Sequence, residues 1–205
     1  MYVENRTITN NMKNNARKIV KAVDKMRANS RDHRMWKNIP LAEECMQMLK
    51  DLDNPKETPL GKALACEAIC EQLSEYDVPR LVISFLRQER EWLEQSDEEC
   101  DNGPTVEEVN QNIQRLEDYI DTQHVSTEEF INRYNRYLKF DPIERTPQWE
   151  ECYYEVAKEC DRRLGDTPRG MGFCFAYWST LRGVLAERGI HWQSPHEMNP
   201  RVMFD

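Results

Sequence analysis

The chain has 205 residues, which is enough for one large domain or two small ones. Hydrophobic residues make up 39% of it and recur in nearly every segment, which excludes a disordered chain. The formal net charge of −9 argues against broad nucleic-acid binding. No stretch approaches the roughly 18 apolar residues of a membrane-spanning helix, so no membrane association is expected.

The seven cysteines are an odd number and follow no disulfide framework. The first residues, MYVENRTITNN, are polar and lack the apolar run of a signal peptide. We therefore expect reduced thiols and a cytoplasmic location. The pair Cys66 and Cys70 does not have the C-x-x-C spacing of structural zinc sites, and no H-E-x-x-H occurs. No metal site and no cofactor are predicted.

The first segment is basic although the chain is acidic. Residues 1–40 carry ten Lys or Arg against three Asp or Glu, whereas residues 41–104 carry six against sixteen. An apolar stripe from Met12 to Met26 predicts a helix there. The candidates for phosphate contacts on this helix are Lys13, Arg17, Lys18, Lys21 and Lys25. Two interpretations stay open: these side chains bind phosphate groups of a nucleic acid, or they pack against acidic residues of this chain or of a protein partner.

Seven further segments show the three-and-four spacing of apolar residues that is typical of helices. These segments are 41–52, 60–73, 81–93, 106–120, 130–138, 149–164 and 173–188. Thr105 and Ser126 each stand three residues before a glutamate, as in a capping box, and Thr146 precedes a proline at a first helical position. No convincing strand alternation occurs. The predicted fold class is all-α: an irregular helical bundle or helical-hairpin stack of about eight helices with an ordered C-terminal tail.

A segment with two prolines, KFDPIERTP at 139–147, is the preferred domain boundary. It divides the chain into an N-terminal helical unit, 1–140, and a C-terminal helical hairpin with an ordered tail, 141–205. Two helices bury little apolar surface by themselves. We therefore expect the second unit to dock on the first.

Three of the seven glycines fall in GDTPRGMGFCFAYW, residues 165–178. Backbone N–H groups of Gly170 and Gly172, at the start of a helix and beside Arg169, could hold an anion. The alternative is a tight corner between two helices, with Gly165 ending the first of them. The segment contains neither a P-loop nor a dinucleotide-binding glycine pattern.

The last residues, GIHWQSPHEMNPRVMFD at 189–205, are too apolar for a free tail. Ser194, Pro195 and Glu197 predict a capped helical turn, and we expect the tail to pack back near residues 173–178. Arginine, histidine and aromatic residues gather here, which suits an anionic or planar ligand or a protein interface. The candidate ligand-binding or partner-binding residues are Arg169, Gly170, Gly172, Tyr177, Trp178, Arg182, His191, Trp192, His196 and Arg201. A tail that only seals the core would use the same residues.

The leading functional interpretation is a cytoplasmic protein-interaction or adaptor protein that binds a protein partner through this aromatic and arginine-rich surface. The first alternative is an anion-binding or small-molecule-binding protein, which includes an enzyme, with a pocket between the Gly165–Phe173 turn and the tail. The second is a nucleic-acid-associated factor that uses the basic first helix. A cysteine nucleophile would pair Cys174 with His191 or His196, but the pattern has no specificity and no catalytic residue is predicted. The sequence does not predict an oligomeric state.

Overall fold

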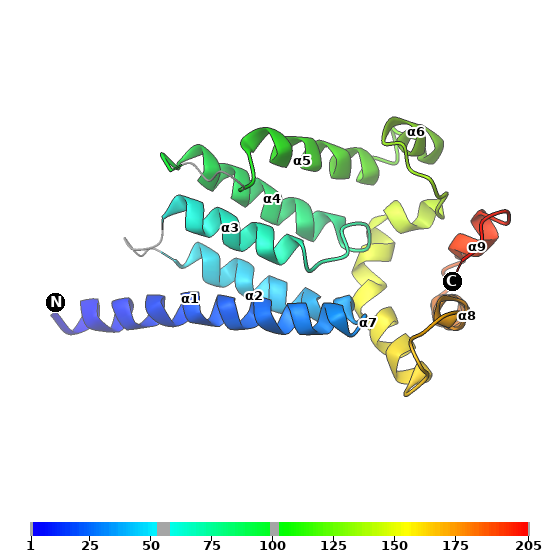
Figure 1. The fold of residues 1–205 in the computed structure, drawn as a ribbon, viewed down its shortest axis with the longest axis horizontal. Coiled ribbons are helices and arrows are strands. Elements are labelled where there is room, and N and C mark those ends of the chain that lie inside the picture. Colours follow the sequence, from blue (N-terminus) through cyan, green and yellow to red (C-terminus); the bar gives the residue numbers. More distant parts are fainter. Residues whose placement is uncertain (1, 53–57, 99–102, 205) are drawn as a thin grey trace. The chain divides into compact units, whose positions relative to one another are not determined.

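The computed structural model describes residues 2–52, 58–98 and 103–204, with side chains described from residue 15 onward. All regular structure in these ranges is helical, which confirms the all-α fold class. The chain forms two compact units (Figure 1). Unit 1 contains Met1–Glu75 and Arg80–Gln114, and unit 2 contains Tyr76–Pro79 and Arg115–Asp205.

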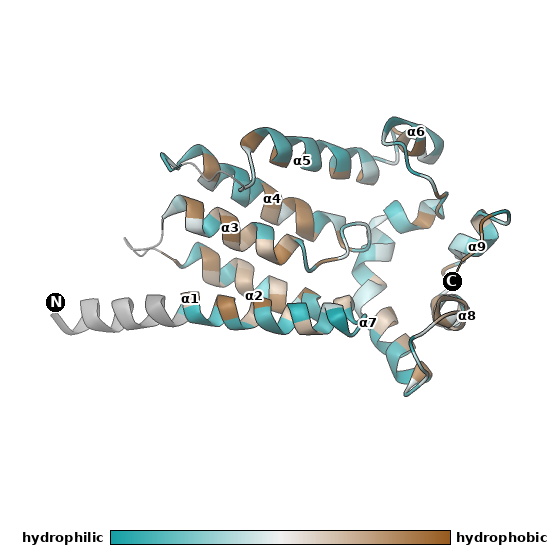
Figure 2. Ribbon diagram, in the orientation of Figure 1, coloured by the Kyte–Doolittle hydropathy of each residue, from teal (hydrophilic) through white to brown (hydrophobic). Residues whose placement is uncertain are grey.

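Unit 1 is an array of helices in which successive members run in opposite directions (Figure 1). Its elements are α1 (Tyr2–Arg31), the 3-10 helix η1 (Met35–Lys37), α2 (Asn38–Lys50), α3 (Pro59–Cys70), α4 (Pro79–Glu94) and the first part of α5 (Val106–Ile120). Both α2 and α3 contact α1. Hydrophilic residues follow much of the described part of α1 and α5, whereas α3 and α4 carry long hydrophobic stretches (Figure 2).

The predicted apolar stripe of α1 lies in the core of unit 1. Ile19, Val23 and Met26 are buried, and complete burial of an aliphatic side chain of this size stabilises a fold by about 1.5–3 kcal/mol. The side chain of Asn38 is completely buried beside them. Its amide nitrogen donates to the backbone carbonyls of Met26 at 3.2 Å and Gln72 at 2.7 Å. Asn38 therefore ties the start of α2 to α1 and to the end of the α3 region.

Unit 2 is built around a helical hairpin. Its elements after α5 are α6 (Thr127–Arg133), η2 (Pro142–Arg145), α7 (Pro147–Leu164), α8 (Phe173–Ala186) and α9 (Pro195–Met198). α7 and α8 pack against each other around an apolar core to which the tail adds Ile190 and Trp192. A second core, made of aromatic residues and Val125, contains Tyr119, Val125, Phe130 and Phe140.

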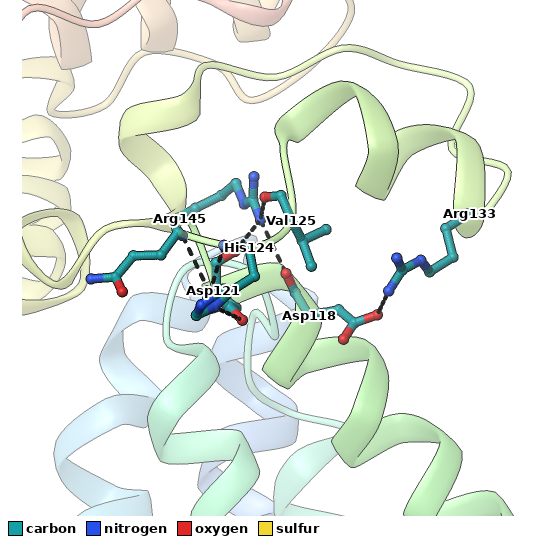
Figure 3. A network of polar contacts seen from close by, with 7 residues as sticks. Asp118, Asp121, His124, Val125, Arg133 and Arg145 are labelled. Atoms are coloured by element: carbon teal, nitrogen blue, oxygen red, sulfur yellow. Dashed lines mark hydrogen bonds and ion pairs between the residues drawn. The ribbon is translucent and has the colours of Figure 1, made fainter.

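The buried guanidinium of Arg145 organises the region between these two cores (Figure 3). It donates to the backbone carbonyls of Tyr119 at 2.6 Å, Asp118 at 3.0 Å, Val125 at 2.7 Å and Asp121 at 3.3 Å. The carbonyls at a helix C-terminus lack partners within the helix and carry the negative end of its dipole. Arg145 thus supplies hydrogen-bond donors to the carbonyls at the end of α5 and places a positive charge beside the negative end of the helix dipole.

These bonds account for a difference from the expected domain boundary. The compact units divide between Gln114 and Arg115, whereas the sequence favours residues 140 and 141. Arg145 lies after the expected boundary, but its partners at residues 118–125 lie before it. Residues 115–140 therefore group with the C-terminal hairpin. The docking of one unit on the other stays a prediction.

The capped helix starts predicted at Thr105, Ser126 and Thr146 are present, but the helix expected over 130–138 ends at Arg133. The side-chain hydroxyl of Thr105 accepts a hydrogen bond from the backbone N–H of Glu108 at 3.2 Å. The backbone N–H of Thr105 donates to the Glu108 carboxylate at 3.0 Å, which completes a capping box. The Ser126 and Thr146 side chains cap α6 and α7. Gly165 ends α7 with a φ of 51°, a conformation that favours glycine. α8 ends at Ala186, two residues before the end expected at residue 188.

Candidate functional site

The C-terminal tail is tied to residues 139–144 by hydrogen bonds. The indole N–H of Trp192 donates to the carboxylate of Glu144 at 2.7 Å, and the backbone N–H of Gln193 donates to Asp141 at 2.7 Å. The side-chain amide of Asn199 accepts from the N–H of Lys139 at 2.9 Å and donates to the carbonyl of the same residue at 2.7 Å. The tail is therefore ordered, as predicted, and its exposed groups are held in fixed positions.

The single turn α9 fixes the middle of the tail. Ser194 and Glu197 form a complete capping box, in which the Ser194 hydroxyl accepts from the N–H of Glu197 and the Ser194 N–H donates to the Glu197 carboxylate at 2.8 Å. Pro195 occupies the first helical position. The second carboxylate oxygen of Glu197 pairs with Arg182 of α8. The turn predicted from Ser194, Pro195 and Glu197 is therefore confirmed.

Four rings from α8 and the tail form what we call the aromatic face: Phe175, Trp178, His196 and Phe204. Phe175 contacts Trp178 at 5.6 Å and His196 at 5.5 Å between ring centroids, and Trp178 contacts Phe204 at 5.1 Å. Each contact is edge-to-face, the arrangement that the ring quadrupoles favour. The tail thus packs on the aromatic segment of α8, as expected.

The aromatic face is open to solvent. The side chain of Phe175 is 42% exposed and the neighbouring Met203 is 92% exposed. His196 is also exposed, whereas Trp178 and Phe204 are half-buried. Arg182 and Arg201 are exposed as well, and Arg182 makes the Glu197 ion pair. Of the residues predicted from the sequence, Trp178 and His196 belong to this face.

Three other predicted site residues serve the interior of unit 2. Trp192 is 5% exposed and lies in the α7–α8 core. Tyr177 shares a side-chain hydrogen bond with Tyr153, and burial raises its pKa well above the usual range, with a smaller contribution from the charge of Asp77. The guanidinium of Arg169 is paired with Asp161 and lies 5.0 Å from the Phe173 ring centre. Trp192 is thus buried, whereas Tyr177 and Arg169 are half-buried and make contacts within unit 2.

The glycine turn has the geometry of a corner between α7 and α8. Gly165 and Gly172 have φ values of 51° and 78°, which other residues rarely adopt. Gly172 directly precedes α8 and makes no side-chain cap. Gly170 is exposed. Because Arg169 is already paired with a carboxylate, the geometry favours the corner interpretation over anion binding.

An open groove of about 650 Å³ lies on unit 2 between α8 and residues 190–193. Buried Trp192 and Ile190 help to line it, and the exposed side chains of Arg182 and His191 stand at its edge together with Asp141. No residue of the Gly165–Phe173 turn lines the groove. The pocket that the small-molecule alternative places between that turn and the tail stays a prediction.

Four of the described cysteines, Cys45, Cys66, Cys70 and Cys160, are poorly suited to nucleophilic chemistry. All six are free thiols, and burial raises the pKa of Cys45 and of Cys160 to about 11. Burial also raises the pKa of Cys66 and Cys70, further than this. A thiol with a raised pKa is protonated near neutral pH and reacts slowly. In the described ranges, no three His, Cys, Asp or Glu side chains are grouped so that they could hold a metal ion.

The predicted phosphate contacts lie on α1. Arg17, Lys18, Lys21 and Lys25 are exposed. Lys13 lies in the part of α1 whose side chains are outside the described residues. None of the described helices combines the length and the apolar character needed to cross a membrane.

Sequence reasoning missed Phe175 and Met203 as surface residues. Both are apolar, and an apolar residue is by default expected in the core. A signal was nevertheless present: Phe175 and Trp178 are three residues apart on one side of α8, and Tyr177 and Leu181 occupy another. Helical periodicity therefore indicated that α8 has two apolar faces. A single core can cover only one of them, so the other face is left at the surface.

Comparison of the chain with protein-family models finds no match, and comparisons with curated proteins and with solved structures find none either. Function is therefore inferred from the geometry of the residues alone.

Proposed function

We propose that the chain is a protein-interaction or adaptor protein that binds its partner through the aromatic face and Met203. The observation that supports this proposal is the exposure of Phe175 beside Trp178, together with the exposure of Met203, which directly precedes Phe204 in the chain. Aromatic residues, Met and Arg are enriched at protein interfaces. Isolated exposed apolar residues are ordinary, but a contiguous group of them is typical of an interaction site.

The aromatic face is also preorganised for binding. Its rings hold one another in edge-to-face contacts, and the tail that carries His196 and Phe204 is anchored by Asn199 and by the α9 capping box. Little side-chain entropy would be lost when a partner covers such a surface. The exposed Arg201 offers a polar rim for carbonyl or carboxylate groups of the partner.

We further propose a reducing compartment such as the cytoplasm as the place of action. All six described cysteines are free. Intracellular reductants keep thiols in this state, whereas secreted proteins usually pair them.

The test is photo-crosslinking in the cells that produce the protein. A benzophenone amino acid at position 203 should capture a defined partner, because Met203 is exposed and directly precedes Phe204 of the aromatic face. The matched control carries the same group at position 137, since Tyr137 is 84% exposed and also belongs to unit 2. Adding Phe175→Ser to the position-203 protein should abolish the crosslink, whereas adding Tyr137→Ser should not.

Identical crosslinks from positions 203 and 137, or a position-203 crosslink that survives Phe175→Ser, would contradict the proposal. Circular dichroism of each variant must match the parent chain, so that loss of the crosslink is not loss of the fold.

The groove between α8 and residues 190–193 supports a second candidate function, the binding of a small anionic or planar molecule. Its polar edge contains Arg182 and His191, and Trp192 contributes an aromatic side chain to its lining. Native mass spectrometry of the purified chain tests this function. A bound mass that disappears on denaturation and is lost in His191→Ala would support it, and a mass that persists in that variant would count against the groove.

A further inference from the structure

The outward face of α1 carries a group of cations that we call the basic face: Arg17, Lys18, Lys21 and Lys25. All four side chains are exposed. At 3.6 residues per turn they fall within an arc of about 100° around the helix axis, and residues 17 to 25 span about 12 Å along it. The basic face is therefore a compact strip of positive charge on a chain whose net charge is −9.

The cations of the basic face differ from several arginines of unit 2. There, carboxylates neutralise Arg133, Arg163 and Arg182, among others. Within the described ranges, no ion pair involves any residue of the basic face; on α1 only Arg27 pairs, with Asp24 at 3.7 Å. Like charges four residues apart, such as Lys21 and Lys25, destabilise a helix by about 0.2–0.5 kcal/mol per pair. A polyanion would remove this repulsion.

The opposite side of α1 is fixed in the core of unit 1. Ile19, Val23 and Met26 are buried there, and Asn38 bonds to the carbonyl of Met26 and to the side chain of Asn29. The basic face is consequently presented by a rigid helix. It also follows that residues 15–31, the part of α1 whose side chains are described, have no free apolar side with which to enter a lipid interface, which amphipathic membrane-binding helices require.

The chemistry of the basic face favours a duplex over a single strand. Proteins that bind single strands without sequence preference stack bases on aromatic rings, and the described part of α1, residues 15–31, contains no aromatic residue. Val20, which is 61% exposed, is the only large apolar residue that is exposed on residues 15–31. Contacts from such a face would reach phosphates rather than base edges.

We infer that the basic face of α1 binds the phosphate backbone of double-stranded DNA without sequence preference. B-form DNA is favoured over duplex RNA because its major groove is about 12 Å wide and admits a helix, whereas the A-form major groove is deep and narrow. Four phosphate contacts give a slope of about −3.6 for the logarithm of affinity against the logarithm of salt concentration. Affinity should thus fall on the order of 10²-fold between 50 and 200 mM salt.

The test is fluorescence anisotropy of a labelled 20-base-pair DNA duplex titrated with the full chain at several salt concentrations. The variant Lys18→Gln/Lys21→Gln/Lys25→Gln should bind at least tenfold more weakly at low salt, and its slope should shrink to about −0.9. The matched control, Lys50→Gln/Lys158→Gln/Arg188→Gln, removes the same charge from other exposed positions. It should keep the affinity and the slope of the parent chain.

Three results would overturn the inference. One is absence of salt-dependent DNA binding by the parent chain at 50 mM salt. Another is equal weakening in the two triple variants, which would indicate net charge rather than the basic face. The third is a stronger interaction with an RNA duplex of the same sequence, or with phosphatidylserine vesicles, than with the DNA duplex. The outcome of this test is independent of the proposed function of the aromatic face, because none of the substituted residues belongs to that face.

Discussion

Replacement of Glu89 by glutamine should change the pH dependence of stability in a defined way. Glu89 lies on α4 and is 2% exposed, and its Oε2 has no hydrogen-bond partner within the described part of the chain. Burial raises the pKa of this carboxyl from its ordinary 4.5 to about 8, and the charge of Glu67 adds to the effect. A buried group of this kind is tolerated because it stays neutral.

The sign of the effect follows from the two pKa values. Below about pH 4.5 the carboxyl is protonated in both the folded and the unfolded chain. Between pH 4.5 and about 8 only the unfolded chain releases the proton, so stability falls as the pH rises. Each pH unit in this window changes the free energy of unfolding by about 1.4 kcal/mol, which amounts to a loss of up to about 5 kcal/mol above pH 8.

Urea unfolding followed by tryptophan fluorescence between pH 5 and pH 9, at constant ionic strength, measures this loss. Glu89→Gln keeps the shape of the side chain but cannot ionise. The free energy of unfolding of Glu89→Gln minus that of the parent chain should increase by several kcal/mol from pH 5 to pH 9. The control Glu91→Gln changes an exposed carboxyl on the same helix and should give a constant difference. Parallel pH curves for Glu89→Gln and the parent chain would refute the reasoning.

Two further predictions concern unit 2. Arg145→Met should lower the free energy of unfolding by at least about 3 kcal/mol, because it leaves several buried carbonyls at the end of α5 without a donor. Urea unfolding checks this, and Arg133→Met, which removes a more exposed ion pair, should cost about 1 kcal/mol or less. Asn199→Ala should release the tail from residue 139, so that the amide of Lys139 exchanges hydrogen faster. Unchanged exchange at Lys139 would show that the tail is held by other contacts.

The fold class could be predicted from the sequence because its signals are local. The apolar spacing of Ile19, Val23 and Met26, the Thr105 capping box and the glycine after Leu164 each depend on a few neighbouring residues. The compact units could not be predicted in the same way. Arg145 reads as a surface residue in the sequence, and only its position beside the end of α5 makes it the buried link between residues 118–125 and the hairpin.

The candidate site shows a corresponding division between residue type and residue position. The sequence identified the tail and α8 as the region where arginine, histidine and aromatic residues gather, and this region does contain the aromatic face. It could not tell Trp192 from Trp178, because both are tryptophans in an apolar segment. Their environments separate them: a hydrogen bond to Glu144 at 2.7 Å satisfies the Trp192 indole inside the core, whereas Trp178 lies between two rings at the surface. A buried tryptophan needs such a partner for its N–H. The position of the Glu144 carboxylate therefore explains why Trp192 is the buried tryptophan and Trp178 the one at the surface.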